Sequence, residues 1–339
     1  MKILLISPTF SGIGGIAQHV RGLNQYLKNA GNKVDVLSSD NSFTIPIKGL
    51  KNPSFVITSS FKTKFMQHHD IVHAHNIPSA KAMKNAKGKK ILTLHGIFSE
   101  QIDMLHGKIT GNFSKKYENS ALQWADVITV VSKDAQVYYK KLGFDTEHIP
   151  NAVNIDSLPV SSEKLYEKQI IYAGRLSKEK GILELLSVAK NLPDDVNLLI
   201  VGNGPEENKV KLASDHQKNI HYFGYLAPEQ TIPLIRGSDI LIQLSLFEGI
   251  STSILEAMAC KTAIIASNVG GNTELIQSKK NGILIDPGND EQILENLIIL
   301  LSNKKFAKEI AENAFKTVQQ YDWKIVGNQY LQIYQNILN

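Results

Sequence analysis

Short apolar runs alternate with amphipathic stretches along almost the whole chain, and this alternation limits the possible folds more than any other feature. Apolar runs too short for a helix predict buried strands, and apolar residues three or four positions apart predict helices. The strands expected in the first half are 3–6, 34–37, 71–75, 90–95 and 127–131, and the helices are 15–29, 78–86 and 113–124. This order is typical of a parallel, doubly wound α/β sheet.

The second half repeats the pattern after a segment, 149–168, that is typical of a linker. The strands expected here are 169–173, 196–201, 220–223, 240–243, 263–266 and 282–285, and the helices are 182–191, 205–217, 229–235, 252–259, 273–277, 290–302, 304–321 and 323–338. A chain of 339 residues exceeds the usual size of one hydrophobic core. The sequence therefore predicts two Rossmann-like domains facing across a deep cleft, with the ligand at the carboxyl ends of the strands.

The composition, 42% hydrophobic and 20% charged, is ordinary for a soluble globular protein. The one cysteine, Cys260, excludes an internal disulfide and a cysteine-rich metal site, and its place in an apolar helix predicts a buried thiol. The start of the chain lacks the features of a signal peptide, and no apolar run is long enough to span a bilayer. A cytoplasmic protein is expected.

Charge is distributed unevenly along the chain. Residues 1–150 carry 19 Lys and Arg against 10 Asp and Glu, a balance of +9, whereas the remainder has a balance of −4. This asymmetry predicts an anionic partner for the first half only. The most basic stretch contains Lys81, Lys84, Lys87, Lys89 and Lys90. A solvated helix face is the alternative interpretation, and nucleic acid is a poor one because no aromatic residues interleave with these lysines.

Two glutamates, Glu248 and Glu256, enclose a glycine and three hydroxyl residues in the second half. We expect Glu248 in a loop after a strand and Glu256 in the first turns of the next helix. The free N–H groups of the helix start would then lie between two carboxylates, which suits a phosphate carrying hydroxyl-rich groups. Ser253 and Glu256 also match a capping box, which would make Glu256 a helix starter only.

Three glycine-rich loops follow predicted strands. Residues 12–17 match the dinucleotide fingerprint G-x-G-x-x-A, with Asp35 and Asp40 downstream, but residues 8–11 separate the strand from the glycines. A loop that lets the backbone approach another ligand fits better, and Gly14 and Gly15 are ligand candidates in either case.

Arg175 and Lys180 flank the second of these loops and could bind phosphate oxygens, although loop cations are usually only solvated. The third loop contains Gly202 and Gly204 just before Pro205. It is either a tight turn between a strand and a helix or a ligand contact.

The order of these motifs along the chain is more specific than any one of them. G-G near the start, Thr93-Leu94-His95-Gly96, G-R-x4-K-G, V-G-x-G-P and E-x7-E followed by Ala-Met-Ala occur in this sequence. In this order they resemble the retaining glycosyltransferase family 4, which has the GT-B fold. The resemblance runs from Lys2 to Leu338. One departure is Asn151-Ala152-Val153-Asn154, where many members have Asn-Gly-Val-Asp, and this puts the turn at the domain crossing in doubt.

The resemblance implies an acceptor-binding domain at 1–154, a donor-binding domain at 155–321 and a last helix, 322–339, that crosses back to the first domain. It implies a UDP- or GDP-linked sugar donor, transfer to a lipid-linked or glycan acceptor with retention, and no metal ion or other cofactor. The residues that it assigns to catalysis are Glu248, His95, Arg175 and Lys180. Those that it assigns to the donor are Gly14, Gly15, Arg175, Lys180, Gly224, Tyr225, Leu226, Glu248, Gly249, Ile250, Ser251, Thr252 and Glu256.

Within this assignment Arg175 and Lys180 neutralise the departing diphosphate, Glu256 binds the ribose hydroxyls, and residues 224–226 meet the nucleobase. Glu248 and the N–H groups of 249–252 hold the donor sugar and the distal phosphate. Glu248 as a covalent nucleophile is an alternative. His95 reaches the sugar from the other domain or makes an interdomain hydrogen bond. Members with lipid-linked acceptors often bind membranes through a basic helix, so peripheral attachment to the inner leaflet is expected through the five lysines.

Two other functions stay open at this level. The first is an NAD-dependent oxidoreductase that uses the Gly12, Gly14 and Ala17 loop. The second is a non-catalytic sugar-nucleotide-binding protein. Sugar epimerases and phosphorylases of the same fold are disfavoured by the motif order.

Overall fold

The computed structural model describes residues 1–12, 14–45, 47, 50–100 and 108–339. The chain divides into two compact units. The first unit contains Met1–Ala152 and Trp323–Asn339, and the second contains Val153–Asp322.

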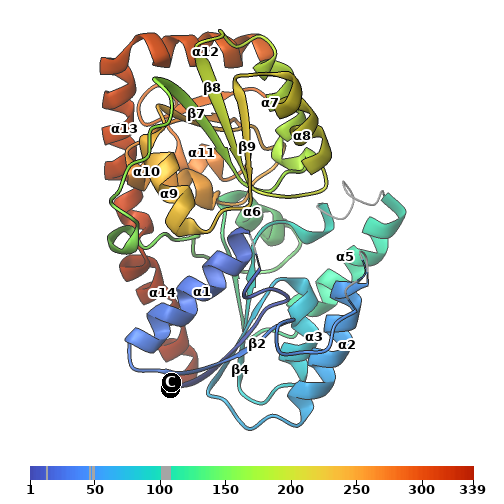
Figure 1. Ribbon diagram of the computed structural model, residues 1–339. Helices are drawn as coiled ribbons and strands as arrows, with labels where there is room; N and C mark the ends of the chain where they lie inside the picture. The colour runs from blue at the N-terminus through green and yellow to red at the C-terminus, as the bar shows by residue number, and fades with distance from the viewer. Residues whose placement is uncertain (13, 46, 48–49, 101–107) are drawn as a thin grey trace. The chain divides into compact units, whose positions relative to one another are not determined.

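The described part of the first unit contains a parallel six-stranded sheet in the order β2-β1-β3-β4-β5-β6. Its strands are β1 (Lys2–Ile6), β2 (Lys33–Leu37), β3 (Ile71–His75), β4 (Lys89–Leu94), β5 (Val127–Val130) and β6 (Glu147–His148). Its helices, several of them labelled in Figure 1, are α1 (Gly15–Asn29), α2 (Lys51–Lys64), α3 (Ile77–Asn85), α5 (Lys108–Leu122), α6 (Lys133–Lys141) and α14 (Trp323–Leu338).

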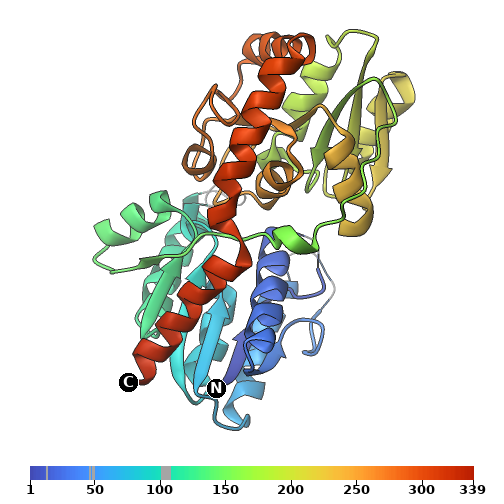
Figure 2. The ribbon, with the colours of Figure 1, turned by 90° about the vertical axis from the view of Figure 1, so that its left-hand side faces the viewer.

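Alternation along β1 gives this sheet two buried faces. Ile3 and Leu5 pack with α1 and α14, and Leu4 and Ile6 pack in the core on the other face. Helix α14, the last red helix in Figure 2, contacts α1 closely enough that a Cβ at Gly327 would lie 2.4 Å from the ring of Tyr26. The final helix therefore belongs to the core of the unit in which the chain begins.

The second unit contains another parallel six-stranded sheet among its described residues, in the order β12-β11-β10-β7-β8-β9. Its strands are β7 (Lys168–Ala173), β8 (Val196–Val201), β9 (Ile220–Gly224), β10 (Ile240–Gln243), β11 (Ala263–Ser267) and β12 (Ile283–Ile285). Its helices are α7 (Ile182–Ala189), α8 (Glu207–His216), α9 (Pro228–Gly237), α10 (Thr252–Cys260), α11 (Asn272–Leu275), α12 (Asp290–Ser302) and α13 (Lys304–Val318). The strand order reverses between β7 and β10, and ligands of open α/β sheets bind at such switch points.

The predicted α/β class and most predicted elements are confirmed, including the last helix at Trp323–Leu338. Among the described α-helices and strands, α2, α6 and the two-residue strand β6 were missed. Helix α2 escaped prediction because its apolar residues do not gather on the buried side. The predicted buried thiol is also confirmed, since Cys260 is buried and burial raises its pKa to about 12. No helix in the described part of the chain is long and apolar enough to cross a membrane.

Candidate active site

The two loops that leave the switch point of the second unit are joined by an ion pair. Lys180 follows β7, Glu248 follows the neighbouring strand β10, and the Lys180 Nζ lies 2.6 Å from the Glu248 Oε2. Ser245 also donates a hydrogen bond to this carboxylate oxygen, at 3.0 Å. The lysine keeps further N–H donors for another anion, because an ammonium group has three. The sheet topology thus brings two of the predicted site residues into direct contact.

Glycines let these loops pack against each other. Gly181 has a φ of +69°, and a Cβ there would lie 1.8 Å from the carbonyl oxygen of Leu244. A Cβ at Gly271 would lie 1.6 Å from the carbonyl oxygen of Gly249. Neither position can accept a side chain without moving the neighbouring loop. These close backbone contacts fix the positions of the loops that carry Lys180 and Glu248.

Arg175 lies on the same edge of the second unit and points toward solvent. Its side chain is 62% exposed, and its nearest acidic partner, Glu179, is 4.0 Å away. The Tyr172 hydroxyl donates a hydrogen bond to the Arg175 carbonyl oxygen at 2.7 Å, which fixes the backbone of the loop. Arg175 is therefore an accessible cation on a restrained loop.

Helix α10 begins at Thr252, four residues after Glu248. Ser251 is the N-cap, and its side chain accepts a hydrogen bond from the Ile254 N–H. The alternative capping box of Ser253 and Glu256 is wrong, because Ser253 instead donates its hydroxyl to the carbonyl oxygen of Ala173 at 2.7 Å. Ser253 thereby ties α10 to β7. Glu256 lies in the second turn of α10 and is partly exposed, so it does not cap the start of the helix.

The remaining second-unit candidates follow β8 and β9. Gly202 and Gly204 have structural roles, since a Cβ at either would lie within 2.3 Å of a carbonyl oxygen in the loop after β7. Gly224 has a φ of +68° at the end of β9, and Tyr225 after it is half exposed. Leu226 packs against the hydrophobic core. Because β9 lies next to β8 in the sheet, the backbone between β9 and α9 leaves the sheet beside the loop that follows β8.

In the first unit the predicted glycine loop leads into α1. Gly14 has a φ of +119° and open space around the position of a Cβ, and α1 begins at Gly15 without a side-chain cap. Arg21 donates hydrogen bonds to the carbonyl oxygens of Phe10 and Gly12, which restrains the loop. The helix start thus offers uncapped N–H groups beside a glycine.

The two acids expected to bind a dinucleotide ribose are both engaged elsewhere. Asp35 lies 2.9 Å from the Nε2 of His69, and Asp40 accepts a hydrogen bond from the Ser11 N–H at 2.9 Å. β1 ends at Ile6 and α1 begins at Gly15, so the strand does not turn directly into the helix. The geometry does not support the NAD site.

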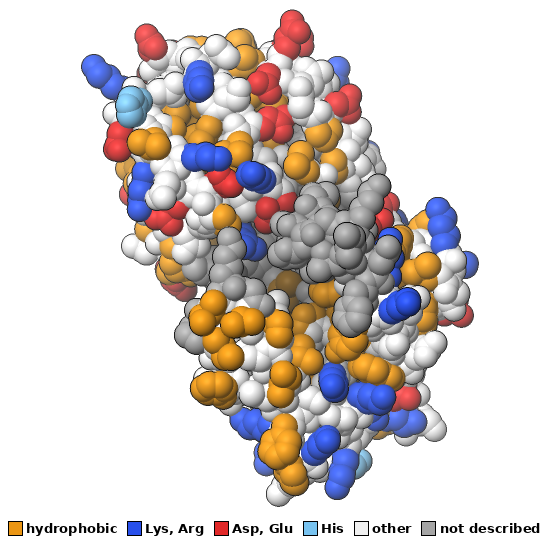
Figure 3. Space-filling view, turned by 90° about the vertical axis from the view of Figure 1, so that its right-hand side faces the viewer, with side chains coloured by type: hydrophobic (Ala, Val, Ile, Leu, Met, Phe, Trp, Pro, Cys, Tyr) orange, Lys and Arg blue, Asp and Glu red, His pale blue; other side chains and the backbone are white. Residues whose placement is uncertain are grey.

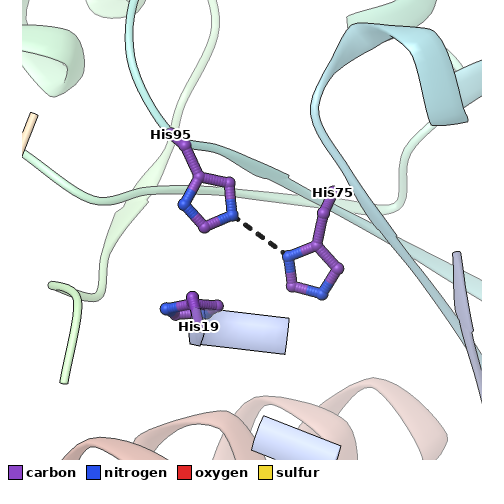
Figure 4. Close-up of side chains that lie close together, drawn as sticks. All are labelled: His19, His75 and His95. Atoms are coloured by element: carbon purple, nitrogen blue, oxygen red, sulfur yellow. Dashed lines mark hydrogen bonds between the residues drawn. The ribbon is translucent and has the colours of Figure 1, made fainter. Parts of the chain in front are cut away.

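His95 lies in a cluster of buried imidazoles in the first unit (Figure 4). The Nδ1 of His75 and the Nε2 of His95 share a hydrogen bond at 3.2 Å, and the ring of His19 lies 4.8 Å from that of His95. The Tyr330 hydroxyl lies 3.3 Å from the Nε2 of His19. Burial lowers the pKa of His95 to about 4, with a smaller opposing effect from a hydrogen bond to Asn151. His95 is therefore neutral near pH 7.

Sequence reasoning missed the companions of His95. His75 is the last residue of β3, next to β4, and His19 comes one turn after Gly15 in α1. Their positions at a strand end and one turn after the glycine loop were the available signal. Burial lowers the pKa of both histidines well below 6.5, and neighbouring imidazoles lower it further.

The same three histidines are the only group of potential metal ligands in the ranges that the structure describes. One nitrogen from each lies within 4.8 Å of the others. Zinc bound to nitrogen at 2.0–2.1 Å brings tetrahedral ligands closer together than that, so the rings would have to contract around a metal. Neutral imidazoles are suitable ligands, and the site is compatible with a metal without being shaped for one.

The five lysines predicted to form a basic surface do not share one helix. Lys81 and Lys84 lie on α3, Lys87 follows its end at Asn85, and Lys89 and Lys90 belong to β4. Lys84 lies over the ring of Trp124, with 4.3 Å between its Nζ and the ring centroid. The three-residue spacing of Lys81, Lys84 and Lys87 predicts a basic stripe on one helix, and this stripe is limited to Lys81 and Lys84, although all five lysines are at least partly exposed.

Each unit gathers its own share of the predicted site. The second unit places Arg175, Lys180, Glu248 and the start of α10 at the carboxyl ends of β7 and β10. In the first unit, His19 of α1 contacts His95, which follows β4, so the uncapped start of α1 and His95 belong to elements that touch.

Each half of the chain matches a protein family. The family described as "Glycosyl transferases group 1" matches residues 156–317, and "Glycosyltransferase Family 4" matches residues 13–157. The chain is 25% identical over 378 residues to a phosphatidyl-myo-inositol mannosyltransferase of Mycobacterium leprae, covering 99% of this chain and 97% of that protein. It is 27% identical over 286 residues to an N,N'-diacetylbacillosaminyl-diphospho-undecaprenol alpha-1,3-N-acetylgalactosaminyltransferase of Campylobacter jejuni, covering 84% of this chain and 65% of that protein.

Solved structures share the fold across the whole chain. Sucrose-phosphate synthase from Thermosynechococcus elongatus matches with a TM-score of 0.83 at 19% identity, covering 99% of each chain. Anabaena HepE in complex with UDP-glucose matches with a TM-score of 0.76 at 18% identity, covering 99% of this chain and 100% of that one. The two family matches cover consecutive parts of the chain, and the solved structures share its GT-B fold. The chain therefore belongs to the group 1 glycosyltransferases of family 4 and is a glycosyltransferase.

Proposed function

We propose that this enzyme transfers a sugar from a UDP- or GDP-linked donor to a lipid-linked or glycan acceptor, with retention at the anomeric carbon and without a metal ion. The observation that carries the proposal is the contact of Lys180 with Glu248 at the switch point, beside an accessible Arg175. A departing nucleoside diphosphate gains negative charge, and fixed cations stabilise that charge as it develops. Arg175 and Lys180 supply two such cations.

The proposed roles of the acids follow from their different surroundings. Glu248 is paired with Lys180 and accepts a hydrogen bond from Ser245, so its free capacity suits a sugar hydroxyl better than nucleophilic attack. Glu256, in the second turn of α10, is proposed to bind the ribose hydroxyls. The N–H groups of 249–252 would receive the distal phosphate at the helix start. The backbone of 224–226 is proposed to meet the nucleobase.

In the first unit we assign the uncapped start of α1 at Gly14 and Gly15 to the diphosphate and the acceptor. His95 is proposed to contact the donor sugar. Because its imidazole is neutral, it would act through hydrogen bonds and would not compete with the phosphate-binding cations.

The printed names of the relatives support a lipid acceptor. One specifies phosphatidyl-myo-inositol and another a diphospho-undecaprenol-linked sugar. We propose that this enzyme acts at the inner face of the cell membrane, with Lys81, Lys84, Lys87, Lys89 and Lys90 facing anionic lipids. A purely non-catalytic nucleotide-binding role is disfavoured by the intact set of cations and acids.

Thermal unfolding with UDP, GDP, ADP or NAD in large excess tests the donor site. A ligand at about a hundredfold over its dissociation constant adds roughly 2.7 kcal/mol, which shifts the midpoint by a few degrees. We expect a shift with one nucleoside diphosphate and none with NAD. A shift with NAD alone would overturn the proposal. The anomeric configuration of the product, read by NMR with the sugar form of the active nucleotide, then tests retention.

A further inference from the structure

Helix α2 (Lys51–Lys64) buries small polar residues and exposes large apolar ones, the reverse of an ordinary surface helix. Its side toward the protein holds mainly small hydroxyl residues, with Ser59, Ser60 and Thr63 buried beside Phe55. Its side toward solvent carries Ile57 at 69% exposure and Phe61 at 64%. An ordinary surface helix buries its apolar face and exposes its polar one.

The exposed apolar residues form one continuous stripe. Ile57, Phe61 and Phe65 recur every fourth residue and so lie on one helix face, and Phe65, just past the helix end, is 75% exposed. The rings of Phe61 and Phe65 contact each other with centroids 5.1 Å apart. Phe43 is also 75% exposed, and its carbonyl oxygen accepts a hydrogen bond from Thr58 of α2 at 2.8 Å. We call Phe43, Ile57, Phe61 and Phe65 the α2 stripe.

The charged residues of α2 itself are all lysines. At 100° per residue Lys64 lies on one side of the stripe, and Lys51 and Lys62 lie on the other. The sequence has no Asp or Glu between Asp40 and Asp70. Figure 3, which faces this side of the first unit, shows hydrophobic side chains gathered together with lysines nearby.

We propose that the α2 stripe inserts into an anionic membrane surface, with α2 lying in the plane of the interface. An exposed apolar face flanked by lysines is the pattern of interfacial helices, in which rings enter the acyl boundary and ammonium groups meet lipid phosphates. A protein partner would also cover apolar residues, but the absence of acids from α2 and the lysines on both flanks of the stripe favour a uniformly anionic surface. This inference deepens the proposed membrane attachment and rests on it, and it moves the main contact from α3 to α2.

The experiment compares sedimentation with vesicles of pure phosphatidylcholine and of phosphatidylcholine with phosphatidylglycerol. We expect the wild type to bind the anionic vesicles. The variant Ile57→Ser/Phe61→Ser/Phe65→Ser should bind them at least about tenfold more weakly. The control is Leu212→Ser/Ile298→Ser, which removes two other exposed apolar side chains, from α8 and α12 of the second unit, and should bind as the wild type does. The three α2 side chains are exposed, so the variant should keep its thermal midpoint and its nucleotide-dependent shift.

Insertion can be read directly at one thiol. Cys260 is buried, so Thr58→Cys, beside the stripe, offers one reactive site for an environment-sensitive fluorophore. Its emission should shift to the blue with anionic vesicles, whereas the same label at Leu212→Cys should not respond.

Each other outcome has a distinct meaning. Failure of the wild type to bind any vesicle overturns both the insertion and the membrane attachment, while donor binding is still judged by its own thermal shift. Loss of binding in Lys81→Ser/Lys84→Ser/Lys87→Ser but not in the α2 variant overturns the insertion alone. A wild type that forms dimers dispersed by the α2 substitutions, without vesicle binding, shows that a second copy covers the stripe and overturns the proposal.

Discussion

The ammonium group of Lys180 lies 2.6 Å from a carboxylate oxygen of Glu248, although 68 positions separate the two residues in the sequence. They meet because β7 and β10 are neighbours in the sheet and both loops leave from their carboxyl ends. The pair is only partly covered, with 28% of the lysine side chain and 10% of the glutamate side chain exposed. A pair this exposed stabilises the fold little, and in the proposed function it serves to place a cation at the donor site.

Replacing Lys180 by alanine should lower kcat/KM by about a hundredfold to a thousandfold, because a preorganised donor to the developing charge is lost. Lys180→Arg should recover part of the activity, since it restores the charge but not the geometry of the pair. Initial rates at several donor concentrations check both variants.

The matched control for this prediction is Lys178→Ala, which removes an exposed lysine from the same short 3-10 helix, Lys178–Lys180. It should change kcat/KM less than about twofold. Equal losses of kcat/KM in the two variants would mean that Lys180 acts only through the overall positive electrostatic potential of the loop.

Gly181→Ala should destabilise the second unit by several kcal/mol. The residue has a φ of +69°, and its new Cβ would lie 1.8 Å from the carbonyl oxygen of Leu244, so strain and overlap add. Gly288→Ala is the control, because it has a φ of +80° with nothing within 4 Å of the Cβ position and should cost only about 1–2 kcal/mol. Far-UV circular dichroism in denaturant measures both. Equal costs would contradict the role assigned to loop packing.

The second-unit loops show how far the sequence could lead. Position after a strand and charge were enough to select Arg175, Lys180 and Glu248 as candidates. The ion pair itself could not be predicted from the pattern, because it depends on β10 lying next to β7, and strand order is not encoded in local periodicity. The hydrogen bond that ties Ser253 to β7 escaped prediction for a similar reason, since its partner, the carbonyl oxygen of Ala173, belongs to a strand far away in the sequence.

The first unit shows the opposite kind of gap. Helix α2 was missed because periodicity arguments assume that the apolar face is the buried one, and here hydroxyl residues face the protein. His19 and His75 were missed because the local pattern does not distinguish them from the other polar residues of α1 and β3. Their meaning emerges only when β3, β4 and α1 place them around His95.

The buried histidines should make the first unit sensitive to acid. Burial lowers the pKa of His73 to about 3 and of His95 to about 4, and the pKa values of His19 and His75 are also lowered. The unfolded chain, with pKa values near 6.5, therefore binds more protons than the folded unit at mildly acidic pH. The free energy of unfolding should therefore have its full value above about pH 6.5 and fall steadily as the pH is lowered from 6.5 to 4.

Tryptophan fluorescence in denaturant can follow this loss selectively. The two tryptophans, Trp124 and Trp323, both belong to the first unit. His75→Asn should give a shallower pH dependence than the wild type, whatever its stability at pH 7.5. His68→Asn, at an exposed position, should leave the slope unchanged. A wild-type stability that is constant from pH 7.5 to 5 would contradict the assignment of these imidazoles as neutral.

Prolonged treatment with EDTA followed by gel filtration should leave turnover within about twofold of the untreated enzyme. In the proposed mechanism, Arg175 and Lys180 supply the positive charge that a metal would otherwise bring to the departing diphosphate. The histidines around His95 are where a metal dependence would have to arise among the described residues, since they alone place three potential ligands within 4.8 Å. If EDTA abolished activity and zinc restored it, His75→Ala would locate the cause, because it removes one ligand without touching the second unit. Restoration that fails in His75→Ala would replace the metal-free mechanism with one that depends on this cluster.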